Sequence, residues 1–368
     1  MKKNILIFGY GYAIQFIDVN NQYTSLFDKD KYHVTVAYLV GEKDEKIRAK
    51  HLADEVVFLN LPKKAIRGLK IGAIKQLLKF HQQKDFEIAI CHRYKPTYLM
   101  LWVSKFKRIP KIISVIHELN TLNTLARKTT LALLAQDNCI FAGVSNAVRD
   151  DLRKTLWGIP KERIITLYNM IDVDLTLPKY LDKDTSRREL KLSSDDFIFG
   201  NMGRLVANKD QATLIQAFAK IKTQCPNAKL VILGEGNLES ELKQLSKNLK
   251  VENDVIFTGF IEDGFRFAKA FDVLVSSSKQ EAFGRVLLEA MLAKVPVIAT
   301  SVNGVPEVID DSGVLIESGN VTLMSDAMFN AYNQDVSARA AWAEKGYNRA
   351  KDEFSLQKFK EVFWGPGV

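Results

Sequence analysis

The sequence predicts an α/β protein with two domains, each built on a doubly wound parallel sheet. The chain has 368 residues, which is enough for two domains of ordinary size with a core each. Short β-branched runs alternate with amphipathic segments of helical period, a pattern typical of parallel sheets covered by helices. The alternation starts again near residue 197 after a polar interval, which indicates a second domain.

In the first half, strands are expected where β-branched and other apolar residues follow one another without interruption. These predicted strands are residues 4–8, 33–39, 55–59, 87–91, 111–116 and 139–143. Residues 66–81 and 97–105 have the apolar spacing of helices that lie between such strands.

In the second half, the predicted strands are residues 197–202, 229–233, 254–258, 272–276 and 295–300, and the predicted helices are residues 212–222, 238–250, 265–270 and 285–293. Between the two series, residues 166–194 contain Pro178 and a charged run, which indicates a hinge followed by a polar linker. Residues 336–364 are helical in pattern and rich in aromatic side chains.

Composition excludes several classes of protein. Apolar residues make up 47% of the chain, so a disordered protein is excluded. Cys91, Cys139 and Cys225 lie far apart without metal-ligand spacing, and we expect reduced thiols in a core. The N-terminal apolar run is too short for a signal peptide, and no stretch approaches the ~20 apolar residues of a membrane span. A cytoplasmic protein is therefore expected.

The formal net charge of +9 is concentrated in the first half of the chain. Residues 61–111 contain 13 Lys and Arg, beginning with Lys63 and Lys64, against only Asp85 and Glu87. The charges could be solvated helix faces, or a surface for anionic lipid headgroups or a phosphorylated acceptor. Nucleic acid is not expected as a partner, because no aromatic and basic recognition motif accompanies the charge.

The densest chemical signal is the segment from Ser276 to Met291. A predicted strand ends at Ser276, a polar loop carries Glu281, and a helix is expected to begin near Gly284. The free amides of Gly284, Arg285 and Val286 would suit an anionic diphosphate. Glu281 and Glu289 can accept hydrogen bonds from sugar and ribose hydroxyls, respectively. Two glutamates eight residues apart are, by themselves, weak support for a binding site, because the chain has 43 acidic residues.

A second segment strengthens this interpretation. The predicted strand over residues 197–202 is followed by Gly203, Arg204 and, five residues later, Lys209. Glycine lets the backbone pass close under a ligand, and the two cations can hold a diphosphate and offset the charge that develops on it. Cations in this position could take the place of the metal ion that other sugar-transferring enzymes need.

Together these segments resemble the retaining family 4 glycosyltransferases, which have the two-Rossmann-domain fold called GT-B. The resemblance covers most of the second half, including the Glu281-x7-Glu289 motif, Leu233-Gly234-Glu235-Gly236 and the segment from Pro296 to Glu307. It implies that Arg204 and Lys209 bind the donor diphosphate and that Glu281 contacts the donor sugar together with the backbone of Phe283 and Gly284. It further implies that Glu289 binds the ribose and that backbone near Phe260 and Ile261 meets the base.

The first half resembles the family more weakly. Ser114-Val-Ile-His117 looks like the strand end whose histidine lies near the donor sugar, and Gly9-Tyr-Gly11 stands where many relatives have paired glycines near phosphate. The aromatic tail resembles a terminal helix that crosses back to the first domain. The resemblance thus implies an acceptor-side domain over residues 1–175 with 353–368, and a nucleotide-sugar domain over residues 176–352, facing each other and closing about a hinge.

Other functions were weighed against this one. A dehydrogenase is excluded, because its glycine fingerprint needs a third glycine where Ile14 stands. Asp172-Val-Asp174 mimics the metal-binding motif of other sugar transferases but falls in the expected hinge, so no metal site is expected. A basic protein that docks on membrane or nucleic acid through residues 61–111 and a GT-B-fold epimerase stay open as alternatives.

The expected function is therefore retaining transfer of a hexose-type sugar from a UDP- or GDP-sugar to a saccharide or lipid-linked acceptor. Arg204, Lys209 and the amides at Gly284 would stabilise the departing nucleoside diphosphate without a metal or other cofactor. A basic transferase without a membrane span suits the inner face of the membrane, in the synthesis of lipopolysaccharide, capsule or another surface glycan.

Overall fold

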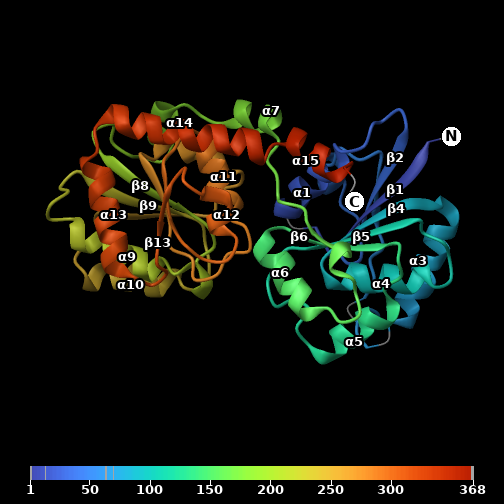
Figure 1. Ribbon diagram of the computed structural model, residues 1–368. Coiled ribbons are helices and arrows are strands. Elements are labelled where there is room, and N and C mark those ends of the chain that lie inside the picture. The colour runs from blue at the N-terminus through green and yellow to red at the C-terminus, as the bar shows by residue number, and fades with distance from the viewer. Residues whose placement is uncertain (1, 13, 63, 69, 366–368) are drawn as a thin grey trace. The chain divides into compact units, whose positions relative to one another are not determined.

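The structure is a computed structural model that describes residues 2–12, 14–62, 64–68 and 70–365 (Figure 1). Lys63, the first member of the predicted basic region, lies outside the described residues. The chain divides into two compact units, of which the first comprises Met1–Tyr168 together with Phe359–Val368 and the second comprises Asn169–Lys358. No helix in the described part of the chain is both long and apolar enough to cross a membrane.

The first unit is built on a seven-stranded parallel sheet with strand order β3-β2-β1-β4-β5-β6-β7. Its strands are β1 (Lys3–Gly9), β2 (Tyr32–Tyr38), β3 (Glu55–Phe58), β4 (Phe86–His92), β5 (Lys111–Ile116), β6 (Cys139–Gly143) and β7 (Ile164–Thr166). Its helices are α1 (Ile14–Thr24), α2 (Glu45–Ala49), α3 (Ile71–Lys84), α4 (Tyr94–Ser104), α5 (Leu125–Leu134) and α6 (Asn146–Thr155). The central strands are buried along most of their length, as expected for a sheet covered on both faces.

The second unit has a six-stranded parallel sheet with strand order β10-β9-β8-β11-β12-β13. Its strands are β8 (Phe197–Met202), β9 (Ala228–Leu233), β10 (Val255–Gly259), β11 (Val273–Ser276), β12 (Val297–Thr300) and β13 (Val314–Ile316). Its helices are α7 (Val173–Thr176), α8 (Lys183–Glu189), α9 (Gln211–Ile221), α10 (Glu239–Asn248), α11 (Arg285–Leu292), α12 (Val305–Ile309), α13 (Val321–Asn333) and α14 (Val336–Glu353). The predicted class, two Rossmann-like α/β domains with parallel sheets, is confirmed.

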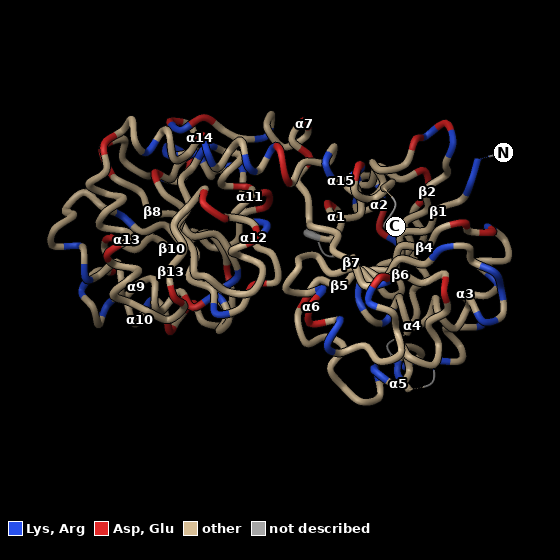
Figure 2. Tube along the Cα trace, in the orientation of Figure 1, with Lys and Arg blue, Asp and Glu red and all other residues tan. Residues whose placement is uncertain are grey.

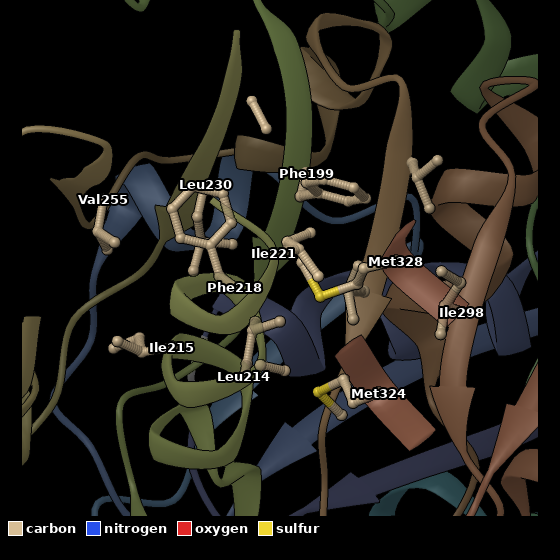
Figure 3. Packing of buried hydrophobic residues seen from close by; sticks show 14 of the residues in the cluster. Phe199, Leu214, Ile215, Phe218, Ile221, Leu230, Val255, Ile298, Met324 and Met328 are labelled. Atoms are coloured by element: carbon tan, nitrogen blue, oxygen red, sulfur yellow. The ribbon is translucent and has the colours of Figure 1, made fainter. Parts of the chain in front are cut away.

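The core of the second unit shows why these segments adopt their structure. Phe199 and Leu230 of the sheet pack against Phe218 of α9 and Met324 and Met328 of α13, and all five side chains are buried (Figure 3). The apolar residues of α9 recur at helical spacing, so one stripe of the helix meets the sheet.

The terminal helix α15 (Leu356–Phe363) belongs in large part to the first unit. The ring of Phe359 lies 5.3 Å from that of Tyr23 in α1, and Phe363 lies 5.9 Å from Phe27. The indole nitrogen of Trp364 donates a hydrogen bond of 3.2 Å to the Leu26 carbonyl. The aromatic tail therefore completes the packing of a domain that begins at the other end of the chain.

Several predicted elements need correction. The helix expected over residues 66–81 begins at Ile71, because Lys70 before it has a left-handed backbone with φ of 56°. The helix expected over residues 97–105 begins at Tyr94, directly after Arg93, which has φ of 74°. Residues 265–270 form a 3-10 helix, η4 (Gly264–Ala270), and the three-residue strands β7 and β13 had no counterpart in the prediction.

The polar linker expected up to residue 194 is wrong over residues 183–189, which form helix α8. This helix is held to the second unit by Arg187, whose guanidinium is buried and pairs with Asp272 at 2.7 Å. Arg187 also donates to the carbonyls of Ala270, Ser193 and Ser194. A charged run was interpreted as solvated linker, but one of its charges is a buried anchor.

Candidate active site

The predicted site residues of the second unit gather at one edge of its sheet. Strand order changes direction between β8 and β11, and the carboxyl ends of parallel strands at such a point form a ligand-binding crevice. Gly203 and Arg204 follow β8, and Glu281 lies in the loop after β11. Gly234 follows β9, and Phe260 and Ile261 follow β10. The topology thus brings together segments up to about 80 residues apart in the sequence.

The centre of this group is an ion pair between Lys209 and Glu281. The Lys209 ammonium donates to Glu281 Oε2, and both side chains are largely buried. Backbone contacts hold the two loops together, since Lys279 N donates to the Asn208 carbonyl at 2.8 Å and Ser277 Oγ donates to the Lys209 carbonyl at 2.9 Å. Hydrogen bonds between the two loops therefore hold the carboxylate and the ammonium next to each other.

The backbone of Glu281 is fixed on both sides by the turn at Asn303 and Gly304. Glu281 N donates to Asn303 Oδ1 at 3.2 Å, and Gly304 N donates to the Glu281 carbonyl at 3.1 Å. Asn303 has a left-handed backbone with φ of 44°, which asparagine tolerates better than most residues. Asn303 was not predicted as a site residue, although an Asn-Gly pair after a strand is a recognisable turn signal.

Helix α11 begins beside Glu281. Gly284 has φ of 94°, and a Cβ at this position would lie 2.7 Å from Leu287 Cδ1, so the turn into the helix requires glycine. The same Cβ would lie 3.4 Å from Glu281 Cγ, which places the carboxylate loop next to the helix start. Amides in the first turn of a helix, here those of Arg285 and Val286, point along the axis and favour anions.

The remaining predicted residues around α11 have different surroundings. The Phe283 side chain is buried with its ring 5.5 Å from that of Phe354, so only its backbone could serve a ligand. Glu289 is half-buried one turn into α11, and its carbonyl accepts a hydrogen bond of 2.6 Å from the Tyr180 hydroxyl. Desolvation by burial raises the pKa of Tyr180, and the nearby Glu289 carboxylate raises it further.

Two glycines bring the loops after β8 and β9 into close contact. Gly234 has φ of 143°, and a Cβ there would lie 2.0 Å from the Gly203 carbonyl oxygen. Gly234 N donates to the Gly259 carbonyl at 3.0 Å, which links this point to the loop after β10. Arg204 and Phe260 are exposed, whereas Ile261 is half-buried. An exposed cation and an exposed ring therefore flank the close approach of Gly203 and Gly234.

In the first unit, His117 follows β5 and contacts a second histidine. The imidazoles of His117 and His92 share a hydrogen bond of 2.9 Å between His117 Nε2 and His92 Nδ1. His92 ends β4 and is buried, and burial, with a smaller contribution from the Arg93 charge, lowers its pKa to about 3. Sequence reasoning missed His92; its place at the end of the strand predicted next to that of His117 was the available signal.

Gly9 and Gly11 have a packing role in the loop after β1. A Cβ at Gly9 would lie 3.2 Å from the Tyr38 ring, and one at Gly11 would lie 3.2 Å from Val40 Cγ2. The loop borders a pocket of about 270 Å³ that also reaches Asn20 and His92. A neighbouring pocket of about 310 Å³ contains His117. Of the predicted site residues, His117, Gly9 and Gly11 thus belong to the first unit and all others to the second.

The structure gives the Asp172-Val-Asp174 segment a structural role. The Asp172 side chain caps α7 by accepting a hydrogen bond of 3.0 Å from Leu175 N. Among the residues that the structure describes, no three His, Cys, Asp or Glu side chains are grouped so that they could hold a metal ion.

Comparison with known proteins identifies the family. Residues 24–175 match the family described as Glycosyltransferase Family 4, and residues 182–349 match Glycosyl transferases group 1. An N-acetylgalactosamine-N,N'-diacetylbacillosaminyl-diphospho-undecaprenol 4-alpha-N-acetylgalactosaminyltransferase of Campylobacter jejuni is 30% identical over 277 residues, which are 73% of this chain and 72% of the relative. An N-acetyl-alpha-D-glucosaminyl L-malate synthase of Bacillus anthracis is 28% identical over 306 residues, covering 80% and 78% of the two chains. The chain belongs to the glycosyltransferases that combine a Glycosyltransferase Family 4 segment with a group 1 segment.

Solved structures share the fold at lower identity. A glycosyltransferase of Rickettsia africae superposes with a TM-score of 0.84 at 17% identity, over 98% of this chain and 97% of the other. Anabaena HepE, solved in complex with UDP and glucose, superposes with a TM-score of 0.79 at 20% identity over the same shares. Both neighbours have the two-domain glycosyltransferase fold predicted here.

Proposed function

We propose that this glycosyltransferase moves a hexose-type sugar from a UDP- or GDP-sugar to a saccharide or lipid-linked acceptor. The observation that carries the proposal is the meeting of Lys209, Glu281 and the start of α11 at one edge of the second sheet. A cation and a helix N-terminus suit a diphosphate, and an adjacent carboxylate suits sugar hydroxyls. The complex of Anabaena HepE with UDP and glucose supports a donor of this kind.

Each predicted residue receives a role in this proposal. Arg204, Lys209 and the amides of Arg285 and Val286 hold the diphosphate, and Gly203 and Gly234 let the backbone pass close beneath it. The carboxylate of Glu281 accepts hydrogen bonds from the transferred sugar, and the backbone amides of Phe283 and Gly284 contact the same sugar.

The nucleoside and the sugar have further partners. Glu289 accepts hydrogen bonds from the ribose, and the backbone at Phe260 and Ile261 meets the base. His117 offers a hydrogen bond to a sugar hydroxyl from the first unit, while Gly9 and Gly11 shape the loop next to it.

The proposed reaction retains the anomeric configuration and uses no metal. The acceptor oxygen forms a bond to the anomeric carbon while the bond from that carbon to the donor phosphate breaks. The departing phosphate oxygen takes the acceptor proton, so no protein base is required. Lys209, Arg204 and the helix amides stabilise the charge that develops on the leaving diphosphate.

The proposed setting is surface-glycan synthesis, such as lipopolysaccharide or capsule, at the inner face of the membrane. A lipopolysaccharide core biosynthesis glycosyltransferase of Rhizobium meliloti is 26% identical over 74% of this chain, which supports the pathway class. Membrane attraction would come from the basic residues 61–111. Replacing Lys64, Arg67 and Lys75 by Gln should weaken binding to anionic vesicles at low salt; equal binding would remove the membrane part of the proposal.

A donor screen tests the central proposal. Thermal unfolding is measured with a panel of UDP- and GDP-sugars, since a ligand that binds only the folded state raises the melting temperature. We expect one nucleotide sugar to stabilise the wild type and to lose this effect in Lys209→Ala. If no member of the panel stabilises the protein, a nucleotide-sugar donor is rejected.

Two further measurements test the mechanism. Turnover should persist in excess chelator, and loss of activity that manganese restores would overturn the metal-free route. NMR of the product should show the anomeric configuration of the donor sugar, and an inverted product would reject retention.

A further inference from the structure

The pocket of about 310 Å³ in the first unit is surrounded by cations. It lies where strand order changes direction between β1 and β4, at the carboxyl ends of β4 and β5. Arg93 and Lys95 come from the loop after β4 and the start of α4, and Arg127 comes from α5. Figure 2 shows Lys and Arg along α3 and α5 of the same unit. These cations converge from segments that the sequence keeps more than 30 residues apart.

The charge in the pocket is only partly compensated. Three cations and one carboxylate line it, and this carboxylate, Glu118, accepts a hydrogen bond of 3.1 Å from Arg93. Lys95 Nζ lies 4.7 Å from the centre of the Tyr10 ring, and the Arg127 guanidinium lies 4.7 Å from that of Tyr94. Aromatic faces stabilise cations but leave their charge in place, so the lining has a net charge of 3 − 1 = +2.

Two observations on neighbouring groups agree with an excess of positive charge. Lys70 has its ammonium 4.0 Å from the centre of the Tyr98 ring, and its pKa is lowered by burial and then by the charges of Lys95 and Arg127. Arg93 Nε is buried and has no hydrogen-bond partner among the described residues. The lining thus holds excess positive charge and an unsatisfied donor in one place.

We propose that this pocket binds a phosphate or diphosphate group of the sugar acceptor. Guanidinium groups bind phosphate oxygens through paired hydrogen bonds, and a group with two negative charges matches the net charge of the lining. A neutral saccharide would leave these cations uncompensated. The inference rests on the proposed function, since it names the acceptor class, and places the phosphate beside His117, which lines the same pocket.

The phosphate could be attached to a lipid or to a water-soluble molecule. Helix α5, which supplies Arg127, also exposes Leu125 and Leu133, with 68% and 73% of their surface accessible. A lipid chain attached to the phosphate could cover these side chains, and a soluble phosphate ester could not.

The test measures binding of geranyl diphosphate and of inorganic pyrophosphate to the full-length protein by calorimetry. One series contains saturating UDP and a second contains saturating GDP, so that binding in the second unit is blocked whichever nucleotide the donor carries. In Lys95→Gln/Arg127→Gln the affinity for geranyl diphosphate should fall about tenfold or more. The matched control Lys105→Gln/Lys107→Gln removes the same charge from exposed positions outside the pocket lining and should bind as the wild type does. Arg127→Lys, which keeps the charge, should lose less affinity for geranyl diphosphate than the double variant does.

The outcomes separate the two proposals. The phosphate site is overturned if the control variant loses as much affinity as the pocket variant, or if the pocket variant loses none. Tighter binding of succinate than of either probe would also overturn it. If geranyl diphosphate binds much more tightly than pyrophosphate, and Leu125→Ser/Leu133→Ser removes the difference, the phosphate is lipid-borne; equal binding of both probes indicates a soluble ester. The nucleotide that binds the wild type, UDP or GDP, should bind all variants equally; failure of both nucleotides to bind the wild type would instead reject the nucleotide donor.

Discussion

Lys209 donates a hydrogen bond to Glu281 across two loops that follow the neighbouring strands β8 and β11. The pair stands at the start of α11, and further hydrogen bonds between the same loops hold it in place. In the proposed function the ammonium meets a phosphate and the carboxylate meets the transferred sugar. This one relationship therefore connects the nucleotide and the sugar parts of the proposed donor.

Removing the carboxylate of this pair should damage turnover more than donor binding. In Glu281→Ala we expect kcat to fall about 100-fold or more, the size seen when a group that stabilises a transition state is lost. The measurement is sugar transfer at saturating donor, with the melting temperature as a control for folding. Wild-type kcat in Glu281→Ala would contradict the assigned role.

Glu289 should behave differently from Glu281. Because it is assigned to the ribose, Glu289→Ala should raise the donor KM about tenfold and change kcat little. Glu289→Gln keeps the shape and an acceptor oxygen and should be intermediate. A large loss of kcat in Glu289→Ala with unchanged KM would exchange the roles of the two glutamates.

Burial of neutral His92 predicts that acid destabilises the first unit. Its pKa is lowered to about 3 in the folded unit by desolvation, with a smaller contribution from the Arg93 charge, whereas an unfolded histidine titrates near ~6.5. Between these values the unfolded chain binds more protons, so stability is complete above about pH 6.5 and is lost as pH falls. From pH 7 to pH 5 this histidine should remove about 2 kcal/mol of unfolding free energy.

The comparison of His92→Asn with the wild type isolates this contribution. The variant should lose about 2 kcal/mol less between pH 7 and pH 5. His51, whose burial lowers its pKa to about 4, acts in the same direction in both proteins and cancels in the comparison. Urea unfolding followed by tryptophan fluorescence in a Trp342→Phe background reports on the first unit. Identical acid sensitivity would contradict the prediction.

Two cations on α8 share Asp272 but should differ in their effect on stability. Arg187 has only 5% of its side chain exposed, and Arg187→Ala leaves the Asp272 carboxylate short of a buried partner, so we expect a loss of about 3–5 kcal/mol. Lys183 is 51% exposed, and Lys183→Ala should cost at most about 1 kcal/mol. Denaturant unfolding of the second unit measures both, and equal losses would contradict the distinction.

The sequence was sufficient to predict an element where its local apolar pattern agrees with its burial in the structure. Strands β5, β6 and β8 occupy the predicted residues, because their largely apolar runs are buried on both faces of a parallel sheet. The boundaries of α3 and α4 could not be predicted, since Lys70 and Arg93 have positive φ angles that their residue types do not indicate.

Contacts between segments that are distant in the sequence account for the other features that could not be predicted. The linker prediction failed because Arg187 pairs with Asp272, 85 residues further along the chain. Arg93 and Lys95 were counted as part of the basic region over residues 61–111, whereas Arg127 lies outside that region. Nothing in the sequence spacing indicates that Arg93 and Arg127 line the same pocket. Lys209 and Glu281 were both predicted as site residues, because each stands in a motif that follows a predicted strand. Their ion pair was not predicted, since it depends on the strands β8 and β11 being neighbours in the sheet.

The packing of α15 has a consequence for the order of biosynthesis. Phe359 and Phe363 are buried against the first unit, so that unit is made of two pieces separated in the chain by the whole of the second. Domains generally fold as they emerge from the ribosome, amino-terminal part first. Here the first unit emerges first, but the rings of Tyr23 and Phe27 lack their contacts with Phe359 and Phe363 until the second unit has been translated. Of these two units, the one that is translated first is thus the second to acquire its complete core.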